Sequence, residues 1–131
     1  MLESLKNDML VSFLSERCAL TPVQLDTILS AQIDGNLQDK ISRRDKHRLT
    51  QGSFVRTLRQ GQSNIEASMY TLILLEYLGL IRPQDLNRLA KLGDLISKVR
   101  ESSPTGEEVE RLISAVQEFA ESFSQRRKLI V

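Results

Sequence analysis

Basic side chains are concentrated in one short stretch of this 131-residue chain. Residues 40–59 contain seven lysines and arginines against a single acidic residue, Asp45, which gives the stretch a net charge of +6. The rest of the chain has eleven basic and sixteen acidic residues, so the overall charge of +1 conceals this asymmetry. A cluster of this kind produces a focused positive field that attracts a polyanion. The residues that we expect to neutralise the phosphates of double-stranded DNA are Lys40, Arg43, Arg44, Lys46 and Arg48.

Side chains suited to reading base edges follow directly in the sequence. Arg56 can pair with guanine through two hydrogen bonds, and Gln60 or Asn64 can pair with adenine in the same way. Ser53 can hydrogen-bond to either base. The full set of predicted DNA-contacting residues in this part of the chain is Thr50, Gln51, Ser53, Arg56, Arg59, Gln60 and Asn64.

A simpler explanation exists for each of these residues. Lysines and arginines often collect on a solvated surface that has no partner. Arg56 and Arg59 are equally compatible with ordinary exposed helix positions, and Asn64 with a helix cap. The charge cluster therefore predicts a DNA-binding surface but does not by itself exclude a solvated one.

Catalytic and metal-binding chemistry has little support in the composition. The single cysteine, Cys18, and the single histidine, His47, cannot form a zinc site of soft ligands, and one cysteine cannot form an intramolecular disulfide. His47 lies among basic residues, where we expect it to be a neighbour of phosphates or a solvated side chain. No phosphate-binding loop or dinucleotide motif is present. We expect a protein without enzymatic activity, metal or cofactor, in a reducing, cytoplasmic setting.

The hydrophobic pattern predicts an all-α fold of five to six helices. Apolar residues recur every three to four positions along nearly the whole chain, and no segment alternates over the length of a strand. We expect helices near residues 2–16, 22–34, 51–60, 63–78, 83–100 and 105–125, and a short, weakly patterned helix near 37–46. Thr21, Pro22 and Gln24 form a predicted start signal for the second of these helices.

Gly61 and Gly79 are predicted to end the two helices in the middle of the chain. Apolar residues surround the segment 63–78 on every side, so we expect that helix to be central and buried over most of its length. No stretch of the chain is long and apolar enough for a membrane span, because the most apolar window, residues 69–81, has only 13 residues.

The last predicted helix carries an apolar seam at spacings of four, three and four. Such a seam is typical of a coiled coil or a helical hairpin. It either forms the interface of a homodimer or packs within one chain against the helix at 83–100. The four residues of this seam, our candidate dimer interface, are Leu112, Val116, Phe119 and Phe123.

Two short stretches resemble helix-turn-helix proteins. LTQGSFVRTLRQ, residues 49–60, resembles the start of the recognition helix in tetracycline-repressor-like regulators. LEYLGLI, residues 75–81, resembles the end of the recognition helix in winged helix-turn-helix proteins. The first resemblance implies that the helix at 51–60 enters the DNA groove. The second implies that the helix at 63–78 enters it, with Gly61 in the turn. Because Arg82 and Pro83 lead directly into another helix, we expect the wing to be absent.

Together these observations predict a sequence-specific transcriptional regulator of helix-turn-helix type. We expect residues 1–82 to form the DNA-binding domain and residues 83–131 a C-terminal association region, with a homodimer bound to double-stranded DNA. The alternative is a helical adaptor that binds another protein and not DNA, with its basic segment against an acidic surface.

Overall fold

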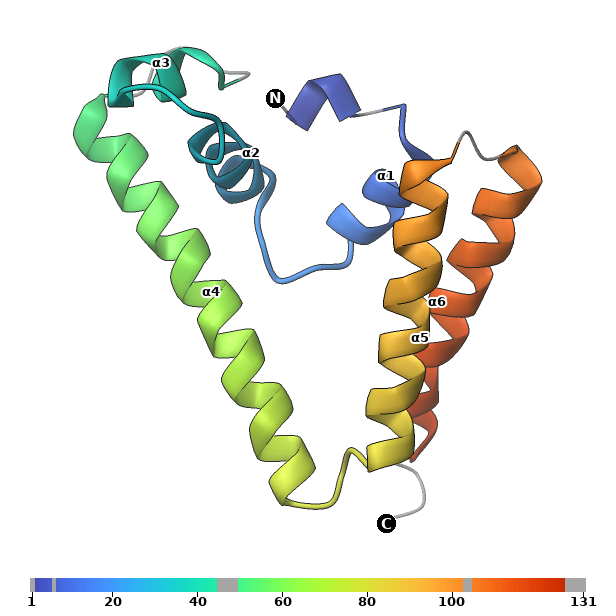
Figure 1. The fold of residues 1–131 in the computed structure, drawn as a ribbon. Helices are drawn as coiled ribbons and strands as arrows, with labels where there is room; N and C mark the ends of the chain where they lie inside the picture. The colour runs from blue at the N-terminus through green and yellow to red at the C-terminus, as the bar shows by residue number, and fades with distance from the viewer. Residues whose placement is uncertain (1, 6, 45–49, 103–104, 127–131) are drawn as a thin grey trace. The chain divides into compact units, whose positions relative to one another are not determined.

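The computed structural model describes residues 2–5, 7–44, 50–102 and 105–126, and it is all-helical over these residues (Figure 1). The elements are η1 (Leu2–Leu5), α1 (Met9–Ser15), α2 (Pro22–Ala31), α3 (Leu37–Ser42), α4 (Gln51–Tyr77), α5 (Pro83–Glu101) and α6 (Gly106–Arg126). The prediction of an all-α fold is confirmed. The chain divides into two compact units, Met1–Ile73 and Leu74–Val131, whereas the sequence placed the boundary at residue 82.

Local hydrogen bonds explain where the first helices begin. The Asp8 side chain accepts hydrogen bonds from the backbone N–H groups of Leu10 and Val11 and so caps α1. Consequently the single helix expected at 2–16 is in fact two, a short 3-10 helix and α1. Thr21 and Gln24 form the predicted reciprocal capping pair at α2.

The helix α3 starts with a second reciprocal cap. The Asn36 side chain accepts from the backbone of Asp39, and the Asp39 carboxylate accepts from the backbone of Asn36. Gly35 precedes this cap with φ of +138°, a conformation that side chains with a Cβ rarely adopt. Helix α3 ends at Ser42, earlier than the predicted residue 46.

The long helix α4 corrects two predictions. It runs without interruption from Gln51 to Tyr77, so Gly61 does not end a helix. Its second half is also not buried, since Met69, Ile73 and Tyr77 expose 55%, 62% and 85% of their surface. The apolar pattern correctly predicted that this part of the chain is helical, but the predicted burial is wrong. The only fully buried residues of α4 are Phe54 and Gly61, in its first half.

The end of α4 is set by Gly79, as predicted. Gly79 has φ of +75°, its N–H donates to the carbonyl of Glu76, and the N–H of Leu80 donates to the carbonyl of Leu75. This pair of bonds is a Schellman motif. The chain then passes through Ile81 and Arg82 directly into α5, as the sequence predicted for a protein without a wing.

In the second unit α5 and α6 form a helical hairpin. Leu92 of α5 and Leu112 of α6 are both buried, with exposed fractions of 9% and 5%. The rings of Phe119 and Phe123 stack edge to face with centroids 5.2 Å apart. The Arg88 guanidinium lies 5.3 Å from the Phe119 ring centroid. The predicted apolar seam therefore packs against the preceding helix of the same chain.

Candidate nucleic-acid interface

The outer side of the first half of α4 is polar and basic. Its residues lie beside an open hollow of about 680 Å³, which α3 borders through Leu37. The α4 residues that line this hollow are Gln51, Gly52, Val55, Arg56, Arg59, Gln60 and Ser63. Apart from Gln51, they follow the spacing i, i+3, i+4, i+7, i+8 and i+11, which places them on one side of a helix. We call this set the basic face of α4.

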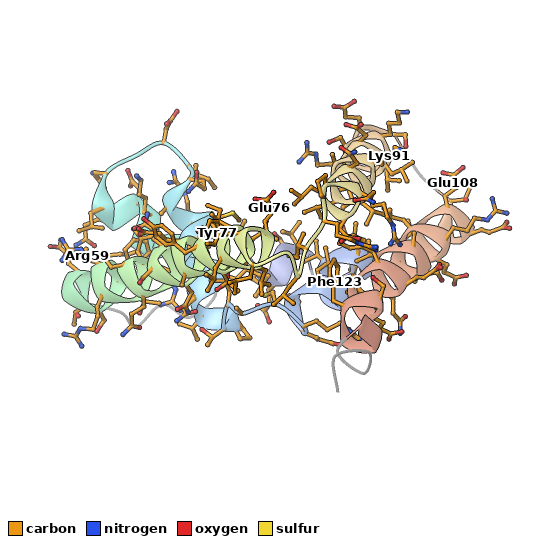
Figure 2. All side chains as sticks on the ribbon, turned by 90° about the horizontal axis from the view of Figure 1, so that it is seen from below. Arg59, Glu76, Tyr77, Lys91, Glu108 and Phe123 are labelled. Atoms are coloured by element: carbon orange, nitrogen blue, oxygen red, sulfur yellow. The ribbon has the colours of Figure 1, made fainter. Side chains whose placement is uncertain are left out.

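The charge of the basic face has one sign. Arg56 and Arg59 are both exposed, and among the described residues no acidic side chain lines the hollow. A guanidinium offers five N–H donors in a planar arrangement that matches phosphate oxygens and the edge of guanine. Figure 2 shows the Arg59 side chain on this half of α4, with Glu76 and Tyr77 near the other end of the same helix. The face can therefore bind an anionic ligand through its two guanidinium groups.

The opposite side of α4 packs against α2. A Cβ atom placed on Gly61 would lie 2.7 Å from Cδ1 of Ile28 and 3.4 Å from Cβ of Gln24, so the two helices approach closely at this residue. One turn later, Nδ2 of Asn64 donates a hydrogen bond of 3.0 Å to Oε1 of Gln24. Phe54 is 1% exposed on the same side. These contacts fix which side of α4 is inward and leave the basic face outward.

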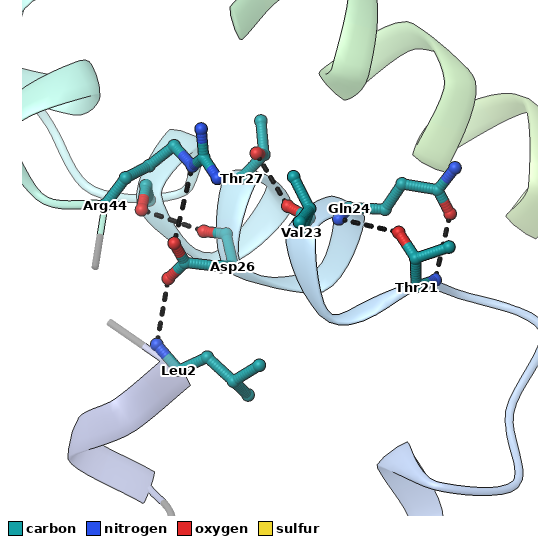
Figure 3. Close-up of polar contacts among 8 residues, drawn as sticks. Leu2, Thr21, Val23, Gln24, Asp26, Thr27 and Arg44 are labelled. Atoms are coloured by element: carbon teal, nitrogen blue, oxygen red, sulfur yellow. Dashed lines mark hydrogen bonds and ion pairs between the residues drawn. The ribbon is translucent and has the colours of Figure 1, made fainter. Parts of the chain in front are cut away.

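A buried ion pair links the segment after α3 to α2 (Figure 3). Nε of Arg44 lies 3.4 Å from Oδ2 of Asp26, and the two side chains are only 3% and 5% exposed. Oδ1 of Asp26 also accepts a hydrogen bond of 2.9 Å from the backbone N–H of Leu2. Two charges buried together stabilise a fold only as a pair, because either one alone would remain uncompensated. Asp26 therefore joins η1, α2 and the segment after α3.

Thr27 and Ser30 of α2 are also buried, and each satisfies its hydroxyl within the helix. Thr27 donates to the carbonyl of Val23 and Ser30 to that of Asp26, each over 2.8 Å. Small polar side chains with internal partners can lie at a helix contact without an unmet hydrogen bond. The inward side of α2 is thus compact enough for close packing.

The predicted phosphate-binding residues have different surroundings in the structure. Arg44 is buried against Asp26, so its assignment to DNA is wrong: the missed partner removes its guanidinium from the surface. Arg43 is half-buried, and its Nη1 donates to the carbonyl of Ile33 over 3.4 Å. Lys40 is half-buried on α3. Lys46 and Arg48, together with His47, lie outside the described residues.

The predicted base-reading residues fall into two groups. Gln51, Arg56, Arg59 and Gln60 are exposed on the basic face. The other residues have structural contacts. The Thr50 hydroxyl accepts from the backbone N–H of Ser53 over 3.1 Å and caps α4, while Ser53 itself is half-buried. Asn64 lies at the contact with α2 and is neither a helix cap nor directed outward, contrary to the prediction.

The continuity of α4 bears on one of the two predicted registers. A turn at Gly61 would be needed for the segment 63–78 to act as a separate recognition helix, and no turn is there. The register with a turn at Gly61 is therefore wrong, while the register with the helix at 51–60 as the recognition element stays a prediction.

The predicted dimer seam on α6 is largely occupied by the hairpin. Leu112 is buried within the chain, and Val116, Phe119 and Phe123 are half-buried. Leu112 and Phe119 each border a cavity shared by α5 and α6, of about 320 and 210 Å³. Of the two arrangements that the sequence left open, the structure contains the intramolecular one.

Sequence reasoning missed two features that position the site. Asp26 lies between apolar residues on the inward side of α2, and a carboxylate in such a place is a sign of a buried partner. Gly61 was interpreted as a helix end, although a small residue inside a long apolar pattern also indicates a close helix contact. Both signals are visible only once the helix faces are assigned.

No protein-family model, curated protein sequence or solved structure matches the chain. Among the described residues, no helix combines the length and the apolar character that crossing a membrane requires. The same residues contain no group of three or more histidine, cysteine, aspartate or glutamate side chains placed to hold a metal ion.

Proposed function

We propose that the protein binds double-stranded DNA as a helix-turn-helix transcriptional regulator, with α3 as the supporting helix and the first half of α4 as the recognition helix. The observation that carries the proposal is the basic face: Arg56, Arg59 and Gln60 are exposed together on one side of α4. The opposite side is held against α2 through Gly61 and Asn64.

The dimensions suit a major groove. An α-helix with its side chains is about 10–12 Å wide, and the major groove of B-DNA is about 12 Å wide. With the basic face turned toward the bases, Arg56 or Arg59 pairs with guanine and Gln60 with adenine, and each good pair discriminates by about 1–3 kcal/mol. In this arrangement Gln51, at the start of the helix, lies beside the phosphates of the DNA backbone.

The proposal includes no enzymatic step, cofactor or metal ion. It places the protein in the cytoplasm as a regulator with direct access to DNA.

The test is binding to random-sequence duplex DNA by fluorescence anisotropy across a salt series. We expect binding that weakens steeply with salt, because each neutralised phosphate releases counterions. Replacing both arginines, Arg56→Ala with Arg59→Ala, should lower the affinity and reduce the slope of log K against log salt by roughly 2.

The matched control removes the same charge elsewhere. Lys91 and Arg100 are exposed on α5, so Lys91→Ala with Arg100→Ala should leave affinity and slope close to wild type. An absence of binding at about 50 mM salt, or equal losses in both double variants, contradicts the proposal.

The second candidate is a helical adaptor that binds another protein. It is favoured by one observation, the exposure of several large apolar side chains in the second half of α4. Lack of DNA binding at low salt in the same experiment would select this candidate.

A further inference from the structure

An apolar groove runs between α5 and α6 on one side of the hairpin. It consists of two adjoining hollows, of about 320 and 210 Å³, which share Leu95 of α5 and Ala115 of α6 as lining residues. The other apolar residues that line it are Leu92, Val99, Leu112 and Phe119. All of them belong to the second compact unit, so the groove is a feature of the hairpin itself. We call it the hairpin groove.

The packing of the two helices explains why this groove is open. Leu92 and Leu112 lie in the seam between the helices and are buried, whereas Leu95 lies beside the seam and is 47% exposed. On a helical wheel Ala115 lies at the corresponding place beside the seam of α6. Its methyl group fills less of this space than a leucine side chain would. The groove can therefore receive apolar side chains from another element.

The two rims of the hairpin groove have opposite charges. The α5 rim has three basic residues, Arg88, Lys91 and Lys98, and Asp94 of the same helix lines neither hollow. The α6 rim contains Glu108, Arg111 and Glu118. Nη2 of Arg111 lies 2.7 Å from Oε1 of Glu107, which compensates its charge and leaves this rim acidic. Figure 2 labels Lys91 on α5 and Glu108 on α6.

Rims of opposite charge restrict the kind of partner. A nucleic acid or an anionic membrane presents negative charge to both rims, so the carboxylates of α6 would repel it. An amphipathic helix has one apolar face and can carry different charges along the two edges of that face. A helix with one acidic and one basic edge matches both rims.

The dimensions of the groove also suit a helix. From Arg88 to Val99 it extends about 17 Å along α5, at 1.5 Å per residue, which corresponds to roughly three helical turns. A small residue such as Ala115 lets a third helix approach closely. An interface of this length is at the lower end of the size range for protein complexes, so we expect weak and reversible binding.

We infer that the hairpin groove is a docking site for an amphipathic helix of another protein, whose acidic edge lies against α5 and whose basic edge lies against α6. Apolar side chains of that helix fill the two hollows beside Leu95 and Ala115, in the manner of helix-in-groove recognition. The inference does not depend on DNA binding, because no residue of α4 takes part.

The test uses synthetic helical peptides as probes for the full chain. The mixed peptide has about 18 residues, long enough for a helix, with leucines at the apolar heptad positions, glutamates along one edge and lysines along the other. Calorimetry measures its affinity, and amide NMR shifts locate its site. We expect binding with the largest shift changes at Leu95, Val99 and Ala115. A peptide with glutamates on both edges should bind at least about tenfold more weakly, because one edge faces the carboxylates of α6.

Charge reversal on α5 tests the rims. Lys91 and Lys98 are exposed, so Lys91→Glu with Lys98→Glu leaves the packing of the hairpin unchanged and makes both rims acidic. This variant should lose at least about tenfold in affinity for the mixed peptide and should prefer a peptide with lysines on both edges. Arg100→Glu, on the opposite side of α5, is the control and should bind the mixed peptide like wild type.

A charge between the rims tests the apolar part of the groove. Leu95→Glu should abolish binding of the mixed peptide, whereas Leu89→Glu should not, since Leu89 is 42% exposed and lines neither hollow. Circular dichroism checks that both variants are folded. If Leu95→Glu does not fold, the charge reversal on α5 decides alone.

Three results overturn the inference. The first is no binding of the mixed peptide at about 1 mM, beyond which an interaction is too weak to be specific. The second is equal affinity for peptides of different edge charge. The third is a folded Leu95→Glu variant that binds like wild type. DNA binding is measured separately, so failure of the peptide to bind does not decide the proposed function.

Discussion

The two halves of α4 have inward sides of the same kind and outward sides of opposite kinds. In the first half the outward side carries Arg56, Arg59 and Gln60. In the second half it carries Ile73 and Tyr77, which are among the most exposed apolar residues of the chain. One helix of 27 residues, about 40 Å long, thus joins a surface suited to an anion and a surface suited to an apolar partner.

This difference shows what the inward contacts contribute. Gly61 and Asn64 hold the first half against α2, and they determine which side of α4 is outward.

The largest expected effect comes from the buried ion pair. Asp26→Ala should lower the free energy of unfolding by about 3–5 kcal/mol, because Arg44 would remain buried without its partner. The measurement is urea unfolding followed by circular dichroism. The exposed pair of Glu107 and Arg111 is the comparison, and Glu107→Ala should cost only about 0.3–0.5 kcal/mol.

Asp26→Asn separates the charge from the hydrogen bond. It keeps an oxygen that can accept from the N–H of Leu2, and it removes the carboxylate that pairs with Arg44. We expect a loss close to that of Asp26→Ala. A loss of unfolding free energy close to that of the exposed pair would show that the buried ion pair does not stabilise the fold.

A smaller effect is expected on the outward side. Gln60→Ala should relax base preference at one position of the selected DNA site by about 1–3 kcal/mol, because a paired amide is lost. The salt slope should not change, since no charge is removed. Competition binding with single-base variants of the site measures both quantities. A uniform loss on all sequences would assign Gln60 to the phosphates instead.

An effect of similar size is expected at the closest helix contact. Gly61→Leu should lower the free energy of unfolding by about 1–3 kcal/mol, because its side chain would overlap Ile28 and Gln24 of α2. Thermal and urea unfolding measure the change.

Gly93 provides the matched control on α5. No atom lies within 4 Å of a Cβ placed there, so Gly93→Leu should stabilise the protein by up to about 1 kcal/mol through helix propensity alone. Equal effects at Gly61 and Gly93 would contradict a close contact between α2 and α4.

The sequence predicted much of the fold because helix starts and stops depend on neighbouring residues. Thr21, Pro22 and Gln24 start α2 as expected, and Gly79 ends α4 as expected. Gly61 was misassigned because the same residue type ends one helix and allows close approach in another. Which of these applies depends on Ile28, which is 33 positions away in the sequence.

The candidate site was also predictable only in part, because some of its features depend on neighbouring residues and others on distant ones. The positions of Arg56, Arg59 and Gln60 on one side of a helix follow from spacing alone. The burial of Arg44 does not, because it depends on Asp26 of another helix. The apolar pattern of residues 63–78 predicted a helix, but spacing cannot show which side the chain itself covers.

The most direct test of the central claim is an amide-resolved NMR titration of the protein with duplex DNA. We expect the largest shift changes to cluster in Gln51–Ser63 of α4, with small changes in α5 and α6. Shifts confined to α5 and α6, or no shifts at low salt, would contradict the assignment of the basic face of α4 to DNA.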